Sequence, residues 1–435
     1  MHSASDDGAP DDGTPDDGAP ESQGRAPLEI RPVGEDELPA FVAAEHVAFS
    51  VELKPERFEA IRGIVELDRT LAAFDAGRIV GPAGAGSWEL TVPGPGTVPA
   101  ATITAVAVLP THRRQGVLTA LMARQLDDVV DRGEAVAVLT ASESIIYGRF
   151  GYGLATWAMG FAIDRPHAGL ARPAEAGGRV LMLDGDEAPK RIPDLYDDLR
   201  RRQPGALSRP PGWWADYFRD PEDEREGASP RFYALHESDA GEADGFVSYR
   251  VKKNWTDDGV AAGDTQVYEL YGSSPAVRAA LWQFCLGVDL TATLSCWNAP
   301  IDEPLRWMLA DPRRFRVTAV SDWLWVRLVD VPAALSGRGY AAPGRLVLDV
   351  ADSFKPHNTG RYELDAGPEG AECRRTDAEP DLAMSVADLG ALYLGGVGCT
   401  ALARAGRIEE RRPGALAAGD ALFATSDTPW CSTEF

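Results

Sequence analysis

The chain has 435 residues, enough for about two to four domains, and its hydrophobic content of 44% is that of a globular protein. Its formal net charge of −24 at pH 7 argues against nucleic-acid binding, which needs clustered lysine and arginine. No apolar run is long enough to span a bilayer. The five cysteines form no CxxC pair, so zinc ribbons and thiol redox motifs are excluded, and their odd number indicates reduced thiols in a cytoplasmic protein.

The first 27 residues form a repetitive acidic segment. Asp-Asp-Gly units alternate with Ala, Thr and Pro, and seven acids stand against one arginine. This composition cannot bury apolar surface, and it offers no apolar core for a signal peptide. We therefore predict a disordered tail over residues 1–27.

Periodic patterns begin at Leu28 and predict an α/β unit. Residues 34–50 are typical of a helix with acids in its first turn, and residues 69–108 of successive strands broken by Gly-containing turns. After Gly116, apolar residues at four-residue spacing predict an amphipathic helix whose inner face is Leu118, Met122, Leu126 and Val130. A buried strand (135–141), a short helix (144–151) and a strand (154–163) complete the unit, which ends near Arg165.

Two further segments follow a Pro-, Gly- and Ala-rich linker at 166–178. Residues 179–318 contain strand patterns at 245–255 and 265–272 and a helical pattern at 279–289. The last segment contains a strand pair (344–354 and 360–366) and a helix (384–396). We place the domains at 28–165, 166–318 and 319–435.

The joint before the first long helix, in "TAVAVLPTHRRQGVLTALM", carries an anion-binding pattern. A helix N-terminus presents unpaired N–H groups and the positive end of the dipole. Gly116 removes a Cβ, which lets a phosphate approach the backbone, and Arg113 and Arg114 can donate charge-assisted hydrogen bonds. The joint is neither a P-loop nor a dinucleotide fingerprint. The alternative is a solvated basic turn at a helix start.

This joint resembles the coenzyme A loop of GCN5-related N-acetyltransferases, Arg/Gln-x-x-Gly-x-Gly/Ala, except that Leu118 replaces the last small residue. That Leu and the later run "YGRFGYG" are similar to one branch, the Eis (enhanced intracellular survival) family. The resemblance covers nearly the whole chain after the tail. It implies an α/β (α+β) fold class: tandem GCN5-related acetyltransferase folds, the first active and the second degenerate, followed by a sterol-carrier-protein-like α+β domain.

The resemblance implies acetyl transfer from acetyl-CoA to a primary amine, without a metal. Tyr147 matches the family's general acid. A phenol with a pKa of about 10 is protonated at neutral pH and can donate its proton. A packing aromatic is the alternative role for Tyr147. The residues expected at the coenzyme are Val106 and Val108 through their N–H groups, Arg113, Arg114, Gly116, Val117 and Ser142.

The family's general base is the chain's own terminal carboxylate, which the resemblance places at Phe435. An α-carboxylate with a pKa of about 3.5 is ionised and can accept a proton. A frayed terminus is the alternative. Glu434 would add negative potential for cationic acceptors, because the family's substrates include aminoglycosides. A homo-hexamer is implied by resemblance only.

Three functions therefore stay open. The first is N-acetylation of small multi-amine molecules, the second is Nε-acetylation of protein lysines, and the third is non-enzymatic binding of a lipid or a partner by the C-terminal domain. The arginine–glycine joint and Tyr147 favour an enzyme, because a binding protein has no need of them.

Overall fold

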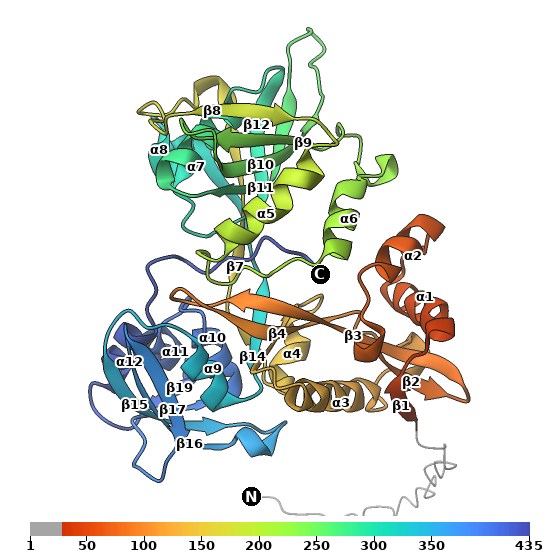
Figure 1. The fold of residues 1–435 in the computed structure, drawn as a ribbon, viewed down its shortest axis with the longest axis vertical. Helices are drawn as coiled ribbons and strands as arrows, with labels where there is room; N and C mark the ends of the chain where they lie inside the picture. Colours follow the sequence, from red (N-terminus) through yellow and green to blue (C-terminus); the bar gives the residue numbers. More distant parts are fainter. Residues whose placement is uncertain (1–27) are drawn as a thin grey trace, which may run out of the picture.

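The computed structural model of the protein describes residues 28–435, so the disorder predicted for residues 1–27 lies outside the described residues. Two seven-stranded sheets are stacked along the long axis of the molecule, and a smaller five-stranded sheet lies beside the first of them (Figure 1). This three-part α/β architecture confirms the predicted fold class. Among residues 28–435, no helix combines the length and the apolar character needed to cross a membrane.

The first sheet has the strand order β1-β2-β3-β4-β5-β14-β6. Helix α3 (Val117–Asp131) connects β4 to β5, which run parallel, and α4 (Ser144–Tyr147) follows β5. Helices α1 (Leu38–Phe49) and α2 (Pro55–Arg62) lie between β1 and β2 in the chain. The strands are β1 (Glu29–Pro32), β2 (Leu71–Asp75), β3 (Arg78–Thr91), β4 (Thr97–Thr104), β5 (Val136–Thr140), β6 (Gly153–Leu154) and β14 (Leu324–Leu328).

Helix α3 forms where it was predicted, but its buried face differs from the predicted one. Met122 and Leu126 are fully buried, whereas Val130 is 43% exposed. Each step of four residues advances about 40° beyond a full helical turn. After three such steps, Val130 is rotated about 120° around the helix axis from Leu118 and no longer faces the core. Leu121 and Val129, at mixed three- and four-residue spacing, are buried instead.

The second sheet has the order β13-β7-β12-β11-β10-β9-β8, and α7 (Pro275–Leu286) connects the parallel strands β11 and β12. Helices α5 (Ala188–Arg200), α6 (Pro211–Arg219) and α8 (Leu305–Met308) belong to the same half of the molecule. The strands are β7 (Trp157–Asp164), β8 (Arg179–Leu183), β9 (Phe232–Glu237), β10 (Ala243–Lys252), β11 (Gly263–Gly272), β12 (Thr291–Ala299) and β13 (Phe315–Asp322).

The two sheets exchange strands. The strand expected over 154–163 is interrupted after β6, and β7 then pairs with β12 and β13 of the second sheet. In return, β13 ends in the second sheet, and β14 pairs with β5 and β6 of the first, with only Trp323 between β13 and β14. The predicted boundaries at 165 and 319 therefore do not follow the sheets at these two strands. Each of the two larger domains contains a strand from beyond its predicted range.

The third sheet has the order β17-β16-β15-β18-β19 and contains the predicted strand pair. Every residue of α10 is buried, and α10 packs so tightly on the first sheet that a Cβ at Gly153 would lie 1.8 Å from the carbonyl oxygen of Ala387. The C-terminal domain is thus fixed to the first domain. Its elements are α9 (Val331–Gly337), β15 (Gly344–Ala351), β16 (Gly360–Gly367), β17 (Gly370–Arg375), β18 (Leu382–Ser385), α10 (Val386–Leu392), α11 (Cys399–Arg404), β19 (Ile408–Glu410) and α12 (Ala415–Phe423).

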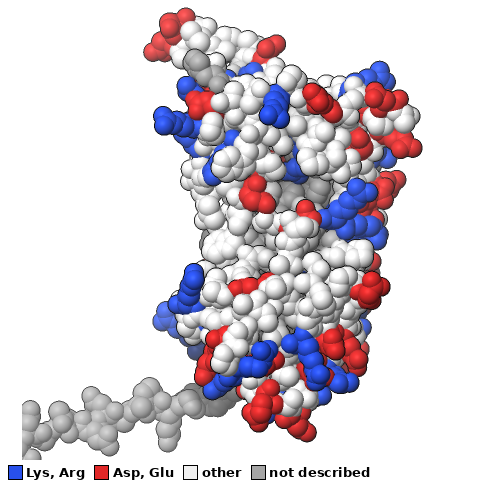
Figure 2. All heavy atoms as spheres, turned by 90° about the vertical axis from the view of Figure 1, so that its left-hand side faces the viewer, with Lys and Arg blue, Asp and Glu red and all other residues white. Residues whose placement is uncertain are grey.

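After α12, residues 424–435 have no regular secondary structure and lead back between the two domains that hold the seven-stranded sheets, where the chain ends (Figure 1). On the face shown in Figure 2, lysine and arginine side chains are interspersed with aspartate and glutamate. This face therefore presents no single basic patch.

Candidate active site

A cleft opens where β4 and β5 separate. The two strands pair only from Ala100 to Thr102 and from Val136 to Val138. Beyond this point Ala105 has a φ of 53°, in the left-handed region, and the chain that follows β4 turns away from β5. A cavity of about 710 Å³ occupies the opening, and the ends of both strands line it.

The backbone after β4 presents N–H groups to this cleft. The N–H groups of Ala107 and Leu109 donate to carbonyl oxygens of β3, at Pro82 (3.1 Å) and Val80 (2.9 Å). Because successive N–H groups of an extended chain point in opposite directions, those of Val106 and Val108 face away from β3, toward the side of β5. Val106 lines the cavity, whereas Val108 does not.

The start of α3 forms an open, positively charged edge next to the cleft. Gly116 is the N-cap residue with a φ of 81°, and a Cβ built there would meet nothing within 4 Å. Arg113 and Arg114 are exposed beside it. The side chain of Val117 is buried, so only its N–H group is available to a ligand. This set of groups fits a pyrophosphate.

Tyr147 ends α4 and points its buried ring into the same cavity as Ser142. Burial raises the pKa of the Tyr147 phenol, and the nearby charge of Glu143 raises it further. The phenol is therefore protonated at neutral pH. An edge contact with the ring of Tyr152, at 6.1 Å between centroids, fixes its orientation.

The end of the chain reaches the same cavity. Glu434 and Phe435 line it, and the indole Nε1 of Trp213 donates to the carbonyl oxygen of Glu434 at 2.9 Å. The phenyl ring of Phe435 packs against Trp88 of β3. Tyr147 and Phe435, which lie far apart in the sequence, therefore face one cavity.

Most charged side chains of the cavity lining are acidic. Its lining includes Glu45, Glu66, Asp216 and Glu434, against the single arginine Arg57. Asp216, on α6 of the second domain, pairs with Arg57 on α2 at 2.7 Å. Burial raises the pKa of the Glu45 carboxyl, although the charges of His46 and Arg57 oppose this shift. Such a lining is suited to cationic molecules.

The structure brings together four of the nine predicted site residues in one cavity: Val106, Ser142, Tyr147 and Phe435. The other five lie outside the cavity lining, along the strand end and the start of α3. The sequence did not predict other residues of the lining, among them Glu45, Trp88, Trp213, Asp216 and Trp323. No local pattern marks Trp213 and Asp216, because only the tertiary fold brings α6 to the first domain.

No group of three or more His, Cys, Asp or Glu side chains within residues 28–435 is arranged to hold a metal ion. The five cysteines are all buried and unpaired. The ionisable side chains that line the cavity are carboxylates, a phenol, an arginine and a histidine.

Comparison with known domain families agrees with this description. Residues 29–155 and residues 205–328 each match a family described as an acetyltransferase (GNAT) domain, and residues 331–432 match the sterol carrier protein domain. The fold and the cleft together define a GCN5-related acetyltransferase, which confirms the predicted class of enzyme.

More than nine-tenths of the chain also matches individual proteins. It is 35% identical to the N-acetyltransferase Eis of Mycobacterium tuberculosis over 406 residues, covering 91% of this chain and 96% of that protein. It is 39% identical to an N-acetyltransferase of Streptomyces avermitilis over 94% of this chain and 99% of that protein. The crystal structure of Eis1 from Mycobacterium abscessus superposes with a TM-score of 0.83 at 36% identity, covering 94% of this chain and 100% of that one. The chain belongs to the Eis family of GCN5-related N-acetyltransferases.

Proposed function

We propose that the protein transfers the acetyl group of acetyl-CoA to a primary amine of a multi-amine, aminoglycoside-like molecule, with Tyr147 as the general acid and the terminal carboxylate of Phe435 as the general base. The observation that carries the proposal is that both residues line one acidic cavity at the separation of β4 and β5. The coenzyme approaches from the start of α3, and the amine from the acidic side.

Acetyl-CoA fits the groups along the strand end and the helix start. The N–H groups at the start of α3, with Arg113 and Arg114, hold the pyrophosphate. The N–H groups of Val106 and Val108 bind the pantetheine arm and polarise the thioester carbonyl. Ser142 lines the cavity at the end of β5, next to the thioester.

The chain's residues then handle two protons. The terminal carboxylate of Phe435 accepts a proton from the acceptor ammonium, directly or through water, which frees the nitrogen lone pair for attack on the carbonyl carbon. The new C–N bond forms as the C–S bond breaks. Tyr147 gives its phenol proton to the departing thiolate, and the resulting phenolate takes the second proton of the acetylated nitrogen, directly or through water. The terminal carboxylate releases its proton to solvent. The ammonium and acetyl-CoA thus give the acetamide, coenzyme A and one solvent proton, so atoms and charges balance.

The acceptor class follows from the lining of the cavity. Acids from the first domain, the second domain and the tail line it, so that a molecule with several ammonium groups can pair with more than one of them. A monoamine cannot. We therefore expect affinity to increase with the number of amines on the acceptor.

The test is thiol release from acetyl-CoA in the presence of a panel of acceptors. The panel contains aminoglycosides, linear polyamines, lysine peptides and matched monoamines. We expect turnover with the multi-amine molecules and a lower acceptor KM than with monoamines. Turnover with lysine peptides alone would replace this acceptor class with protein lysines, and no turnover with any acceptor would contradict the proposed reaction.

A further inference from the structure

The second acetyltransferase-like sheet separates at the place that corresponds to the active cleft. Strands β11 and β12 run parallel, like β4 and β5, and are likewise connected by a helix, α7. Their pairing ends at Val267 and Cys296, although β11 continues to Gly272 and β12 to Ala299. The two strands therefore diverge over these last residues. In the first domain the corresponding space is the proposed acetyl-CoA cleft.

The chain's own C-terminal segment contacts both diverging strands. From β12, the amide Nδ2 of Asn298 donates to the carbonyl oxygen of Cys431 at 3.0 Å, and the indole Nε1 of Trp430 donates to the Oδ1 of Asn298 at 2.8 Å. From β11, Tyr271 has its ring 5.2 Å from that of Trp430. Trp430 and Cys431 are both buried.

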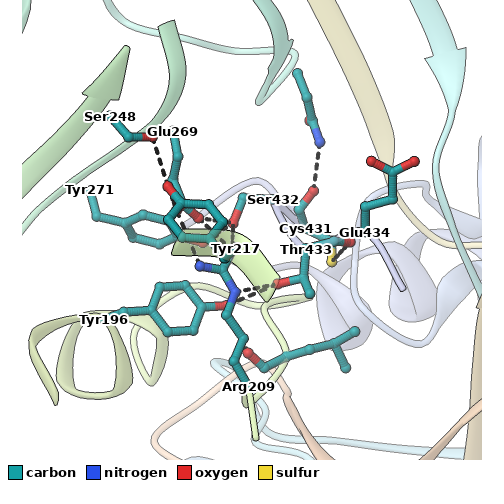
Figure 3. Close-up of polar contacts among 12 residues, drawn as sticks. Tyr196, Arg209, Tyr217, Ser248, Glu269, Tyr271, Cys431, Ser432, Thr433 and Glu434 are labelled. Carbon is teal, nitrogen blue, oxygen red and sulfur yellow. Dashed lines mark hydrogen bonds and ion pairs between the residues drawn. The ribbon is translucent and has the colours of Figure 1, made fainter. Parts of the chain in front are cut away.

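A buried ion pair holds the next two residues of the tail (Figure 3). Arg209 and Glu269 of β11 form a bidentate pair at 2.5 and 3.1 Å, with side chains 1% and 3% exposed. The guanidinium also donates to the hydroxyl oxygens of Ser432 and Thr433, both at 3.0 Å. It lies over the ring of Tyr196, 3.8 Å from the centroid.

The hydroxyl groups in this network have consistent donor and acceptor roles. Tyr196 donates to the carbonyl oxygen of Leu207 at 2.7 Å, so in its 3.2 Å contact with Thr433 the threonine is the donor. Ser432 donates to Glu269 at 2.7 Å, so Tyr271 donates to Ser432 at 3.0 Å. Both tail hydroxyls therefore donate one hydrogen bond and also accept from the second domain, which defines one seating of the tail.

We infer that the cleft of the second domain is a receptor for the chain's own residues 430–433, and that Arg209 and Glu269 are positioning residues for the terminal carboxylate. The following residues, Glu434 and Phe435, line the cavity of the first domain. One short segment thus binds between the diverging strands of the second domain and places its last two residues at the cavity of the first domain. The contacts above define the position of residues 430–433, whereas the effect of that position on catalysis rests on the proposed function.

The test removes the tail hydroxyls while keeping the shape of the side chains. In the variant Ser432→Ala/Thr433→Val, we expect carboxypeptidase A to release Phe435 at least tenfold faster than from the wild type, because the segment is no longer held. We also expect kcat for acetyl transfer to fall about tenfold or more, with KM for acetyl-CoA within twofold. The matched control is Ser426→Ala in the same tail, whose hydroxyl donates to the neighbouring Asp427 and, among residues 28–435, contacts neither Arg209 nor Glu269.

Release of Phe435 from the double variant at the wild-type rate would overturn the inference. Faster release of Phe435 with an unchanged kcat would support the binding of the tail by the second domain but contradict the role of the carboxylate as the base. The two claims can therefore fail separately. If the double variant does not fold, Tyr271→Phe removes one hydrogen bond to Ser432 and keeps the ring that packs on Trp430. Its release of Phe435 is expected to rise severalfold, and an unchanged rate would again overturn the inference.

Discussion

The phenyl ring of Phe435 lies 5.5 Å from the indole ring of Trp88, with an angle of 53° between the ring planes. Trp88 is buried in β3 of the first sheet, so the last residue of the chain packs on a rigid element of the first domain. Such an aromatic pair contributes about 0.5–1.5 kcal/mol beyond its burial. Together with the second-domain contacts of residues 430–433, it holds the terminal residue at the cavity that Tyr147 also lines.

Replacing Tyr147 by Phe should lower kcat about 100-fold or more, because the departing thiolate loses its proton donor. The ring stays in place, so KM for acetyl-CoA should change less than about threefold. Thiol-release kinetics with a multi-amine acceptor measure both values. The matched control is Tyr152→Phe, since the Tyr152 hydroxyl is buried without a hydrogen-bond partner among the described residues. An equal decrease of kcat in the two variants would contradict a catalytic role for Tyr147.

Gly116→Ala should raise KM for acetyl-CoA about tenfold, because a Cβ at the start of α3 intrudes on the space predicted for the pyrophosphate. The matched control is Gly133→Ala at the other end of the helix. Both glycines have a positive φ (81° and 72°) and no neighbour within 4 Å of a Cβ, so both variants carry a similar backbone strain of about 1 kcal/mol. Equal KM values in the two variants would place the coenzyme elsewhere.

Asp216→Asn should raise KM for multi-amine acceptors about tenfold and leave KM for acetyl-CoA unchanged. The substitution removes one carboxylate from the cavity and frees the guanidinium of Arg57, which then repels a cationic acceptor. Asp223→Asn is the control. Asp223 pairs with Lys54 at the same junction between the domains, but this pair is half-exposed and neither residue lines the cavity. A similar rise in KM for both variants would indicate a general loosening of the junction.

Glu45→Gln should make the protein more stable at neutral pH and no more stable in acid. Burial raises the pKa of Glu45 above its value in the unfolded chain, so the unfolded chain releases this proton first and the wild type loses stability as pH rises through that interval. The glutamine variant avoids that loss. Thermal unfolding over a pH series tests this, and a difference in Tm that is independent of pH would contradict it.

The features that the sequence predicted are encoded locally. Gly116 marks a helix start because it stands between two arginines and an amphipathic run in the sequence. Tyr147 follows a buried strand within a motif of a few residues. The strand, helix and joint that carry the coenzyme groups are adjacent in the chain, so their spacing in the sequence already fixes their neighbourhood.

The features that the sequence did not predict depend on distant contacts. Residues 154–163 read as one apolar strand, whereas the N–H groups of Ala155 and Thr156 both donate to the carbonyl oxygen of Leu324 at the point where the strand exchange occurs. Asp216 reaches the cavity only because α6 packs beside α2. A hydrophobicity pattern carries no information on which of two sheets a strand joins.

The role of the terminal carboxylate can be tested by changing that group alone. Cys431 permits ligation of the synthetic peptide Cys-Ser-Thr-Glu-Phe to residues 1–430, with either a free carboxylate or a carboxamide at Phe435. We expect the carboxylate form to be active and the carboxamide to lower kcat about 100-fold or more with an unchanged KM for acetyl-CoA. Equal kcat values for the two forms would contradict the assignment of Phe435 as the general base.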